Sequence, residues 1–315
     1  METVAKDLIA GSISESSRRT YRSAQTRYVN FCRGLLFHPL PASEQLLILF
    51  TAELSQTVAY SSMRVYLSAV RHFHLENGWG DPLKDTAQLD LLLRGAKRQK
   101  PPSNDQRLPV TPLILRMIRR ELEKAPQQYE SLLLWATCCM GFYAFLRSGE
   151  FTCTTGNAFD PTLHITPEDI AVDSREKPTM MKIHIKQSKT DQLRQGINLF
   201  IGATDNDTCP ITAVLSYLAA RGSQSGPLFV WRDGRPLTRA QLVAMLRATL
   251  AQASVDYTRY AGHSFHIGAA TTAAAKGMSE SMIQTLGHWA SDSFKRYIRI
   301  PRSQLALFSK QLAAD

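Results

Sequence analysis

Residues 131–146, SLLLWATCCMGFYAFL, are apolar on nearly every side of a helical projection. Such a segment predicts a helix buried in the middle of a domain, because a helix at the surface needs a polar face. It is shorter than the roughly 18 apolar residues that a membrane span requires. The chain has 315 residues, of which 44% are hydrophobic, enough to enclose that helix in a large core. We therefore expect a soluble globular protein with its main domain built around this segment.

The first third of the chain predicts a separate helical domain. Apolar residues recur at helical spacing from residue 14 to about residue 98, so each helix buries one stripe. Ser43 and Ser61 are expected to cap two of these helices, and Gly78 to end the second. The stripes consist of Tyr21, Ala24, Tyr28, Phe31 and Leu35, and of Met63, Tyr66, Leu67, Val70 and Phe73. We assign residues 1–98 to this domain and residues 99–109, which lack periodicity, to a linker.

Residues 110–315 combine helices with a small amount of strand. Thr111 with Pro112 is typical of a helix start, and Pro210 and Gly222 bound another helix. Apolar and polar residues alternate in MMKIHIKQ at 180–187, and INLFI follows a turn-like segment at 188–196, so these segments predict a short hairpin. A second hairpin is expected about the Asp-Gly pair at 233–234, and helix from about residue 238 onward. The predicted fold class is mainly α with a small β component.

The charge balance favours an anionic partner. The chain has 37 Lys and Arg against 27 Asp and Glu, a net charge of +10, and a strong positive field attracts polyanions such as nucleic acid. Several arginines of the first domain lie opposite the apolar stripes. They form either a DNA-binding surface or simply the solvated side of amphipathic helices. These residues are Arg18, Arg19, Arg22, Arg64 and Arg71.

The cysteines and the N-terminus point to an intracellular protein. The five cysteines are odd in number and show no CxxC spacing, which argues against a disulfide framework or a zinc ribbon and favours buried thiols. The first residues, METVAKDLIAGSISESS, contain neither the basic nor the apolar region of a signal peptide.

Several segments of the second domain place ionisable residues where a core would exclude them. Arg147 directly follows the buried helix, so it needs an anion or a carboxylate such as Glu150, and a purely structural ion pair fits this pattern equally well. His263 and His266 open a helix, where free amides suit a phosphate, and a metal pair is disfavoured because no further ligand is adjacent. The remaining candidates are Lys189 near the hairpin tip, and His288 and Tyr297 in LGHWASDSFKRYIRIP at 286–301.

The order of these residues resembles that of the tyrosine recombinase (phage integrase) family over about residues 14–315. The matching pattern is R-x-x-E, a hairpin lysine, H-x-x-H, L-G-H and a tyrosine nine positions later. Within the family, FLRSGEF, HIKQSKTDQLRQG, GAATTAAAKGM and RYIRIP are most similar to recombinases of DIRS-type retrotransposons. The resemblance implies an N-terminal helical SAM-like core-binding domain and a mixed α/β catalytic domain. It also implies double-stranded DNA as the partner, and neither a metal ion nor another cofactor.

The resemblance assigns the chemistry to three residues. Tyr297 would attack a DNA phosphodiester, form a 3′-phosphotyrosine and release a 5′-hydroxyl. Arg147 would stabilise the negative charge of the phosphoryl transition state. Lys189 would protonate the departing 5′ oxygen, with Lys186 as the rival lysine.

The same resemblance gives supporting roles to the histidines and exposes one departure. His263 would assist proton transfer at the tyrosine, His288 would hydrogen-bond the phosphate, and Glu150 would position Arg147. His266 stands where the family has a second arginine, and an imidazole offers one hydrogen bond at a time and no permanent charge. We expect normal DNA binding but slow cleavage, a rate that rises toward pH 6 if His266 must be protonated, and faster cleavage by His266→Arg.

The resemblance further implies a clamp around duplex DNA that works as a tetramer on two sites. Leu305, Phe308 and Leu312 form an apolar stripe on a C-terminal helix that either a neighbouring subunit or the same domain would bury. Two alternatives to a recombinase remain open at this point. One is a DNA-binding descendant that has lost strand cleavage, which His266 favours, and the other is a type IB topoisomerase. In a eukaryotic host such a protein would act in the nucleus.

Overall fold

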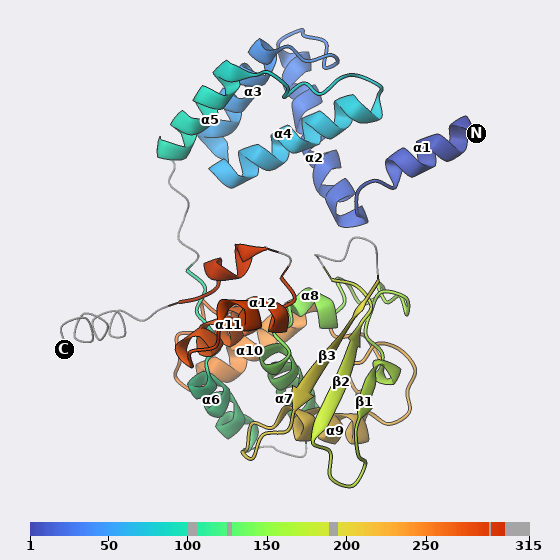
Figure 1. The fold of residues 1–315 in the computed structure, drawn as a ribbon, viewed down its shortest axis with the longest axis vertical. Helices are drawn as coiled ribbons and strands as arrows, with labels where there is room; N and C mark the ends of the chain where they lie inside the picture. Colours follow the sequence, from blue (N-terminus) through green and yellow to red (C-terminus); the bar gives the residue numbers. More distant parts are fainter. Residues whose placement is uncertain (100–105, 125–127, 189–194, 290, 300–315) are drawn as a thin grey trace, which may run out of the picture. The chain divides into compact units, whose positions relative to one another are not determined.

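The structure is a computed structural model that describes residues 1–99, 106–124, 128–188, 195–289 and 291–299. The chain divides into two compact units, Met1–Asp105 and Gln106–Asp315. Both are mainly helical, and the second also contains a small antiparallel sheet, so the predicted fold class is confirmed (Figure 1). Over the residues that the structure describes, no helix combines the length and the apolar character needed to cross a membrane.

The first unit consists of α1 (Glu2–Ala10), α2 (Glu15–Gly34), α3 (Glu44–Thr57), α4 (Tyr60–Glu76) and α5 (Ala87–Gln99). Its core contains most of the stripes that the sequence predicts, with Tyr28, Met63 and Leu67 buried against residues of α3 such as Phe50. Leu35 is an exception: it is 45% exposed, because α2 ends at Gly34. Ser43 caps α3 by accepting a hydrogen bond from the Leu46 amide, as expected.

The structure differs from the local predictions at Ser61 and adds one helix. Helix α4 begins at Tyr60 with Ala59 at the N-cap, so Ser61 lies inside the first turn and does not cap it. Helix α1 was not predicted, because the apolar pattern used to predict helices in this unit begins only at residue 14. Its residues Val4 and Leu8 are exposed.

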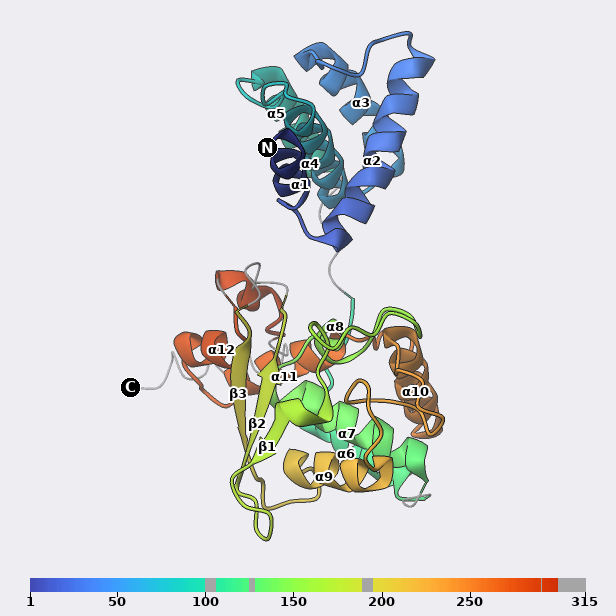
Figure 2. The ribbon, with the colours of Figure 1, turned by 90° about the vertical axis from the view of Figure 1, so that its right-hand side faces the viewer.

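The second unit is built around α7 (Tyr129–Tyr143), as the apolar segment predicts. Every residue from Leu133 to Phe142 is buried. Helices α6 (Pro112–Leu122), α9 (Pro210–Arg221), α10 (Arg239–Gln252) and α11 (Ser264–Ala275) contact α7, which runs through the middle of the unit (Figures 1 and 2). The short helices α8 (Ser148–Phe151) and α12 (Glu280–Leu286) and two 3-10 turns, η1 (Pro167–Asp169) and η2 (Asp292–Arg296), complete the described helical elements. All five cysteines are buried and free, as expected.

The sheet has the order β1-β2-β3, with both neighbouring pairs antiparallel. Strands β2 (Met180–Ile185) and β3 (Ile197–Gly202) form the predicted hairpin, with Ile183 opposite Leu199. Strand β1 (Ile170–Val172) was not predicted because three residues are too few to show alternation. The hairpin expected at 233–234 is short, with one bridge, Val230 to Pro236. Hydrogen bonds from the Trp231 amide to the Arg235 carbonyl and from the Leu237 amide to the Phe229 carbonyl flank this bridge.

Candidate active site

Arg147 lies at the junction between the buried core and the surface of the second unit. The chain leaves α7 through the buried residues Ala144–Leu146, and Arg147 is the N-cap of α8. Its side chain is only 11% exposed, and its Nη1 donates to Glu150 Oε1 at 3.0 Å. The backbone amide of Arg147 donates to the other oxygen of the same carboxylate, at 2.8 Å. The two residues thus form the predicted ion pair, and Glu150 fixes both the backbone and the side chain of Arg147.

His288 joins this pair from a distant part of the chain. It follows α12, and its Nε2 donates to Glu150 Oε2 at 3.3 Å. Burial alone would raise the pKa of the Glu150 carboxyl, but the hydrogen bond from His288 and the adjacent positive charge of Arg147 outweigh burial and hold this pKa below its ordinary value. His288 has a φ of +43°, an uncommon conformation for a residue with a side chain, which is found mainly at turns and functional sites.

His266 is completely buried in the first turn of α11. Its Nδ1 donates a hydrogen bond to the Phe145 carbonyl at 2.5 Å. Because Nδ1 carries the proton, Nε2 of the neutral ring is left as an acceptor, and this atom has no hydrogen-bond partner among the described residues. An acceptor of this kind does not donate to a phosphate.

The environment of His266 also changes its titration. Burial, followed by the positive charge of Arg147, lowers the pKa of His266 to about 3. A pKa this low argues against an increase in cleavage toward pH 6 through protonation of His266. The sequence indicates that the start of a helix disfavours the imidazolium, but it does not reveal that the ring is enclosed.

Tyr297 packs against this buried histidine. It directly follows η2, its side chain is half-buried, and its ring meets the His266 ring edge-on with centroids 4.9 Å apart. On its other side it stacks on Trp289, at 5.8 Å between centroids and 30° between planes. The Tyr297 carbonyl accepts a hydrogen bond from the Thr271 hydroxyl of α11 at 3.1 Å, which ties the tyrosine to the helix that contains His266.

Trp289 links the aromatic cluster to the guanidinium, and the sequence analysis did not select it. The centroid of its ring lies 4.4 Å from the centroid of the His266 ring. The same centroid lies 6.0 Å from the guanidinium carbon of Arg147. A Cβ on Gly287 would lie 1.6 Å from the indole, so glycine is required there for the tryptophan to pack. Its position directly after the candidate residue His288 is the sequence feature that could have identified Trp289 as part of the site.

His263 lies at the edge of this cluster. It occupies the N-cap position of α11, but its side chain does not cap the helix. Instead its Nδ1 is 3.4 Å from Nη2 of Arg239, the first residue of α10. Arg239 is a second residue that the sequence analysis did not select, because it lies in an otherwise ordinary amphipathic helix.

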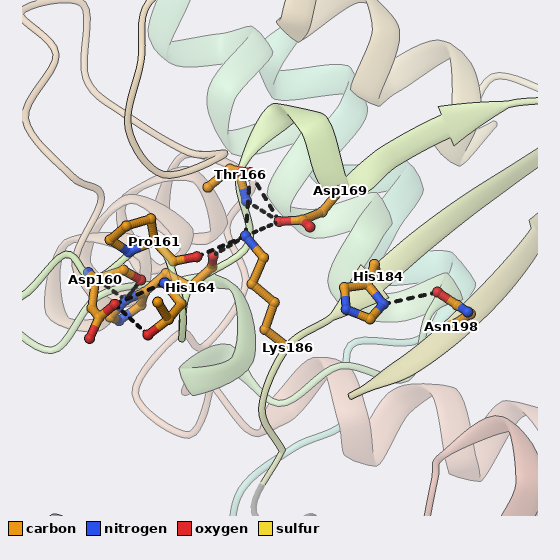
Figure 3. Close-up of polar contacts among 9 residues, drawn as sticks. Asp160, Pro161, His164, Thr166, Asp169, His184, Lys186 and Asn198 are labelled. Atoms are coloured by element: carbon orange, nitrogen blue, oxygen red, sulfur yellow. Dashed lines mark hydrogen bonds and ion pairs between the residues drawn. The ribbon is translucent and has the colours of Figure 1, made fainter. Parts of the chain in front are cut away.

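Of the two candidate lysines, Lys186 is held by the protein itself. Its Nζ is 2.6 Å from Asp169 Oδ2 and donates to the Pro161 carbonyl at 2.9 Å and the His164 carbonyl at 3.3 Å, as Figure 3 shows. Lys186 thereby anchors the end of β2 to the segment that precedes β1. Lys189 lies outside the described residues.

Known proteins are similar to this chain over most of its length. No protein-family model matches the chain. Over 310 residues it is 21% identical to an integrase/recombinase XerD homolog of Selenomonas ruminantium, covering 93% of this chain and 84% of the relative. This similarity supports the predicted resemblance to the tyrosine recombinase family.

Solved structures show the same fold. The Tn1549 transposon integrase in complex with transposon right end DNA has a TM-score of 0.63 at 14% identity, covering 98% of this chain and 99% of that chain. A lambda integrase dimer bound to a COC′ core site has a TM-score of 0.61 at 15% identity, covering 94% and 93%. The similarity to recombinases of DIRS-type retrotransposons stays a prediction.

Five of the predicted site residues form one connected cluster, namely Arg147, Glu150, His266, His288 and Tyr297. Within the described ranges, no three His, Cys, Asp or Glu side chains are grouped closely enough to hold a metal ion. In the first unit, Arg19, Arg22 and Arg64 are exposed, whereas Arg18 and Arg71 pair with Glu15 and Asp81. The apolar stripe at 305–312 lies outside the described residues.

Proposed function

We propose that this protein is a site-specific DNA recombinase that cuts and rejoins duplex DNA through a phosphotyrosine at Tyr297. The observation that supports this most strongly is the position of Tyr297: its ring packs on His266 and Trp289, and Trp289 in turn faces the Arg147 guanidinium. The proposed nucleophile and the Arg147 guanidinium thus contact the same indole ring. Charge stabilisation by a fixed cation is a main source of catalysis in phosphoryl transfer. The Tn1549 and lambda relatives were solved with DNA, which supports DNA as the partner.

The proposed reaction keeps one phosphodiester-type bond throughout. The Tyr297 oxygen attacks the phosphorus, the bond from phosphorus to the 5′ oxygen breaks, and a 3′-phosphotyrosine forms. His263 accepts the tyrosine proton, and Lys189 gives a proton to the departing 5′ oxygen. Lys189 is preferred over Lys186 because the latter is engaged with Asp169. Attack of a 5′-hydroxyl from another strand then reverses these steps and rejoins the DNA.

The proposal includes an assembly of several copies on two DNA sites, as a tetramer, in a mobile element and, for a eukaryotic host, in the nucleus. A lambda integrase dimer on its core site supports assembly on DNA in general terms. In this assembly, the C-terminal segment of one subunit would dock on a neighbouring subunit through its apolar stripe.

The covalent intermediate provides the test. The full chain is incubated with fragmented DNA, the protein is denatured, and DNA that stays attached is sequenced to identify the site. A nicked duplex of that sequence, from which the released fragment diffuses away, should then trap a denaturant-resistant adduct. Tyr297→Phe should form none, whereas the exposed Tyr257→Phe should behave as the unchanged protein. An adduct formed by Tyr297→Phe would disprove the assignment of the nucleophile.

A second candidate is a DNA-binding protein without cleavage activity. The neutral state of His266, whose Nε2 can only accept a hydrogen bond, favours it. The two are separated by the same experiment, since that protein would bind DNA with salt-sensitive affinity but form no adduct. Relaxation of a supercoiled plasmid of arbitrary sequence would instead indicate a type IB topoisomerase.

A further inference from the structure

The buried centre of the site has little positive charge to offer a phosphate. The charge of Arg147 is paired with the Glu150 carboxylate, which holds it at 3.0 Å. His266 is neutral, and its free ring nitrogen is an acceptor. A phosphoryl transition state spreads negative charge over its non-bridging oxygens, so a second cation is needed on the open side of the site.

Arg239 is a cation in the appropriate position. Its guanidinium contacts His263, Nη2 to Nδ1 at 3.4 Å, and its side chain is exposed. Among the described residues, no carboxylate oxygen lies within 4.0 Å of its nitrogens. A guanidinium without a carboxylate partner retains its full charge and its paired donors for an incoming anion.

The fold joins Arg239 rigidly to the segment that carries Arg147. The Arg239 amide donates to the Cys153 carbonyl at 3.2 Å, and the Cys153 amide donates to the Leu237 carbonyl at 3.1 Å. Cys153 lies two residues after the end of α8, so the start of α10 is hydrogen-bonded to the chain that leaves the Arg147 helix.

The side chains of Ser148 and Arg239 both lie close to Gly262. A Cβ on Gly262 would lie 2.3 Å from the hydroxyl of Ser148, the neighbour of Arg147, and 3.4 Å from Arg239 Nε. Only glycine allows this approach. An open hollow of about 560 Å³, bordered by Gly149, Thr152 and Arg239 among others, leaves room beside the guanidinium.

We propose that Arg239 binds the scissile phosphate together with Arg147 and supplies the second positive charge that His266 does not. Arg239 is thereby a catalytic residue, in contact with a non-bridging oxygen. The proposal rests on the proposed recombinase function, and it adds a residue outside the H-x-x-H segment to the site.

The test compares Arg239→Ala with Arg235→Ala, a matched removal of an exposed arginine that pairs with Asp233. On the DNA site recovered from the covalent complex, Arg239→Ala should slow adduct formation by about 10²- to 10³-fold, with DNA affinity close to that of Arg235→Ala. Replacing the scissile phosphate by an uncharged methylphosphonate should abolish most of this difference, because the charge that Arg239 offsets is then absent. Equal rates, or a loss of affinity alone, would overturn the proposal while leaving the recombinase function intact.

A second measurement requires no cleavage, so it tests the Arg239 proposal separately from the proposed recombinase function. Orthovanadate, a phosphate analogue, is titrated into the full chain and followed by vanadium NMR. The unchanged protein and Arg235→Ala should bind it alike, and Arg239→Ala should bind about tenfold more weakly, as expected for loss of one charge-assisted contact. Failure of the unchanged protein to bind vanadate, or identical binding by all three proteins, would contradict the anion site even in a protein that never cleaves DNA.

Discussion

His266 should stay neutral in the folded protein at every pH at which the protein is stable. An exposed histidine has a pKa of about 6.5, and burial beside Arg147 lowers that of His266 to about 3. Between these two pH values, His266 is protonated in the unfolded chain but not in the folded protein. The free energy of unfolding therefore rises with pH in this window and is lost on acidification.

The size of the effect follows from the position of the window. At about pH 5 the unfolded histidine is almost fully protonated, about 1.5 pH units below its pKa, and the folded one is not. Each unit is worth about 1.4 kcal/mol, so acidification from about pH 7 to about pH 5 should cost the unchanged protein about 2 kcal/mol through His266. The carboxyl of Glu150 has a pKa below its ordinary value, so it contributes only at lower pH.

The assay compares the unchanged protein with His266→Asn, whose side-chain amide can still donate to the Phe145 carbonyl but does not titrate. Urea unfolding is followed by tryptophan fluorescence at both pH values, and Trp289 beside residue 266 reports on the second unit. The variant should be less stable at both, since it loses ring contacts, but it should lose about 2 kcal/mol less on acidification. His74, which is also buried with a lowered pKa, is common to both proteins and cancels. An equal loss in the two proteins, or a His266 NMR resonance with a midpoint near 6.5, would refute the reasoning.

The other predictions concern the two lysines, DNA binding and residue 266. Lys189→Ala should slow cleavage by about 10²-fold or more with little change in DNA affinity. A substrate with a 5′-bridging phosphorothiolate should restore the rate of this variant. If it does not, Lys186 becomes the candidate acid. Lys186→Ala should instead lower the melting temperature, because Asp169 loses its partner. DNA affinity should fall steeply with salt, and a flat dependence would contradict electrostatic binding, whereas EDTA should change neither binding nor cleavage. His266→Arg should raise the cleavage rate by about 10²-fold or more. The gain should be larger in the Arg239→Ala background if both arginines bind the same phosphate. A rate equal to that of the unchanged protein would show that residue 266 does not contact the phosphate.

The sequence was most informative where one local pattern decides the structure. An apolar surface on all sides predicts α7, strict alternation predicts β2 and β3, and the order of Arg147, His288 and Tyr297 predicts a recombinase-like site. Patterns were uninformative where an element was too short, as in β1, or where the decisive partner was distant. The Phe145 carbonyl that fixes the His266 tautomer is 121 positions away in the chain, so no local pattern contains it.

Arg239 and Trp289 illustrate the same limit from the other direction. Each has a common residue type in an ordinary setting, one on an amphipathic helix and one in an aromatic-rich segment. Their significance appears only when α10 is hydrogen-bonded to the chain that follows α8 and the indole packs over Gly287. Local sequence therefore identifies the residues that perform the chemistry more readily than those that provide the surrounding charge and shape.

Glu150 explains how such a site can exist before DNA binds. A buried guanidinium without a partner would be strongly destabilising, so Arg147 needs a carboxylate in the free protein. Oε2 accepts from the Arg147 amide and from His288, while Oε1 accepts from Nη1. A phosphate can replace or share the contact at Oε1 without disturbing the bonds at Oε2 that fix the backbone, and a guanidinium has further donors to offer. The ion pair that lowers the net charge of the centre is thus also the device that keeps Arg147 oriented, which is why additional positive charge has to come from residues at the rim.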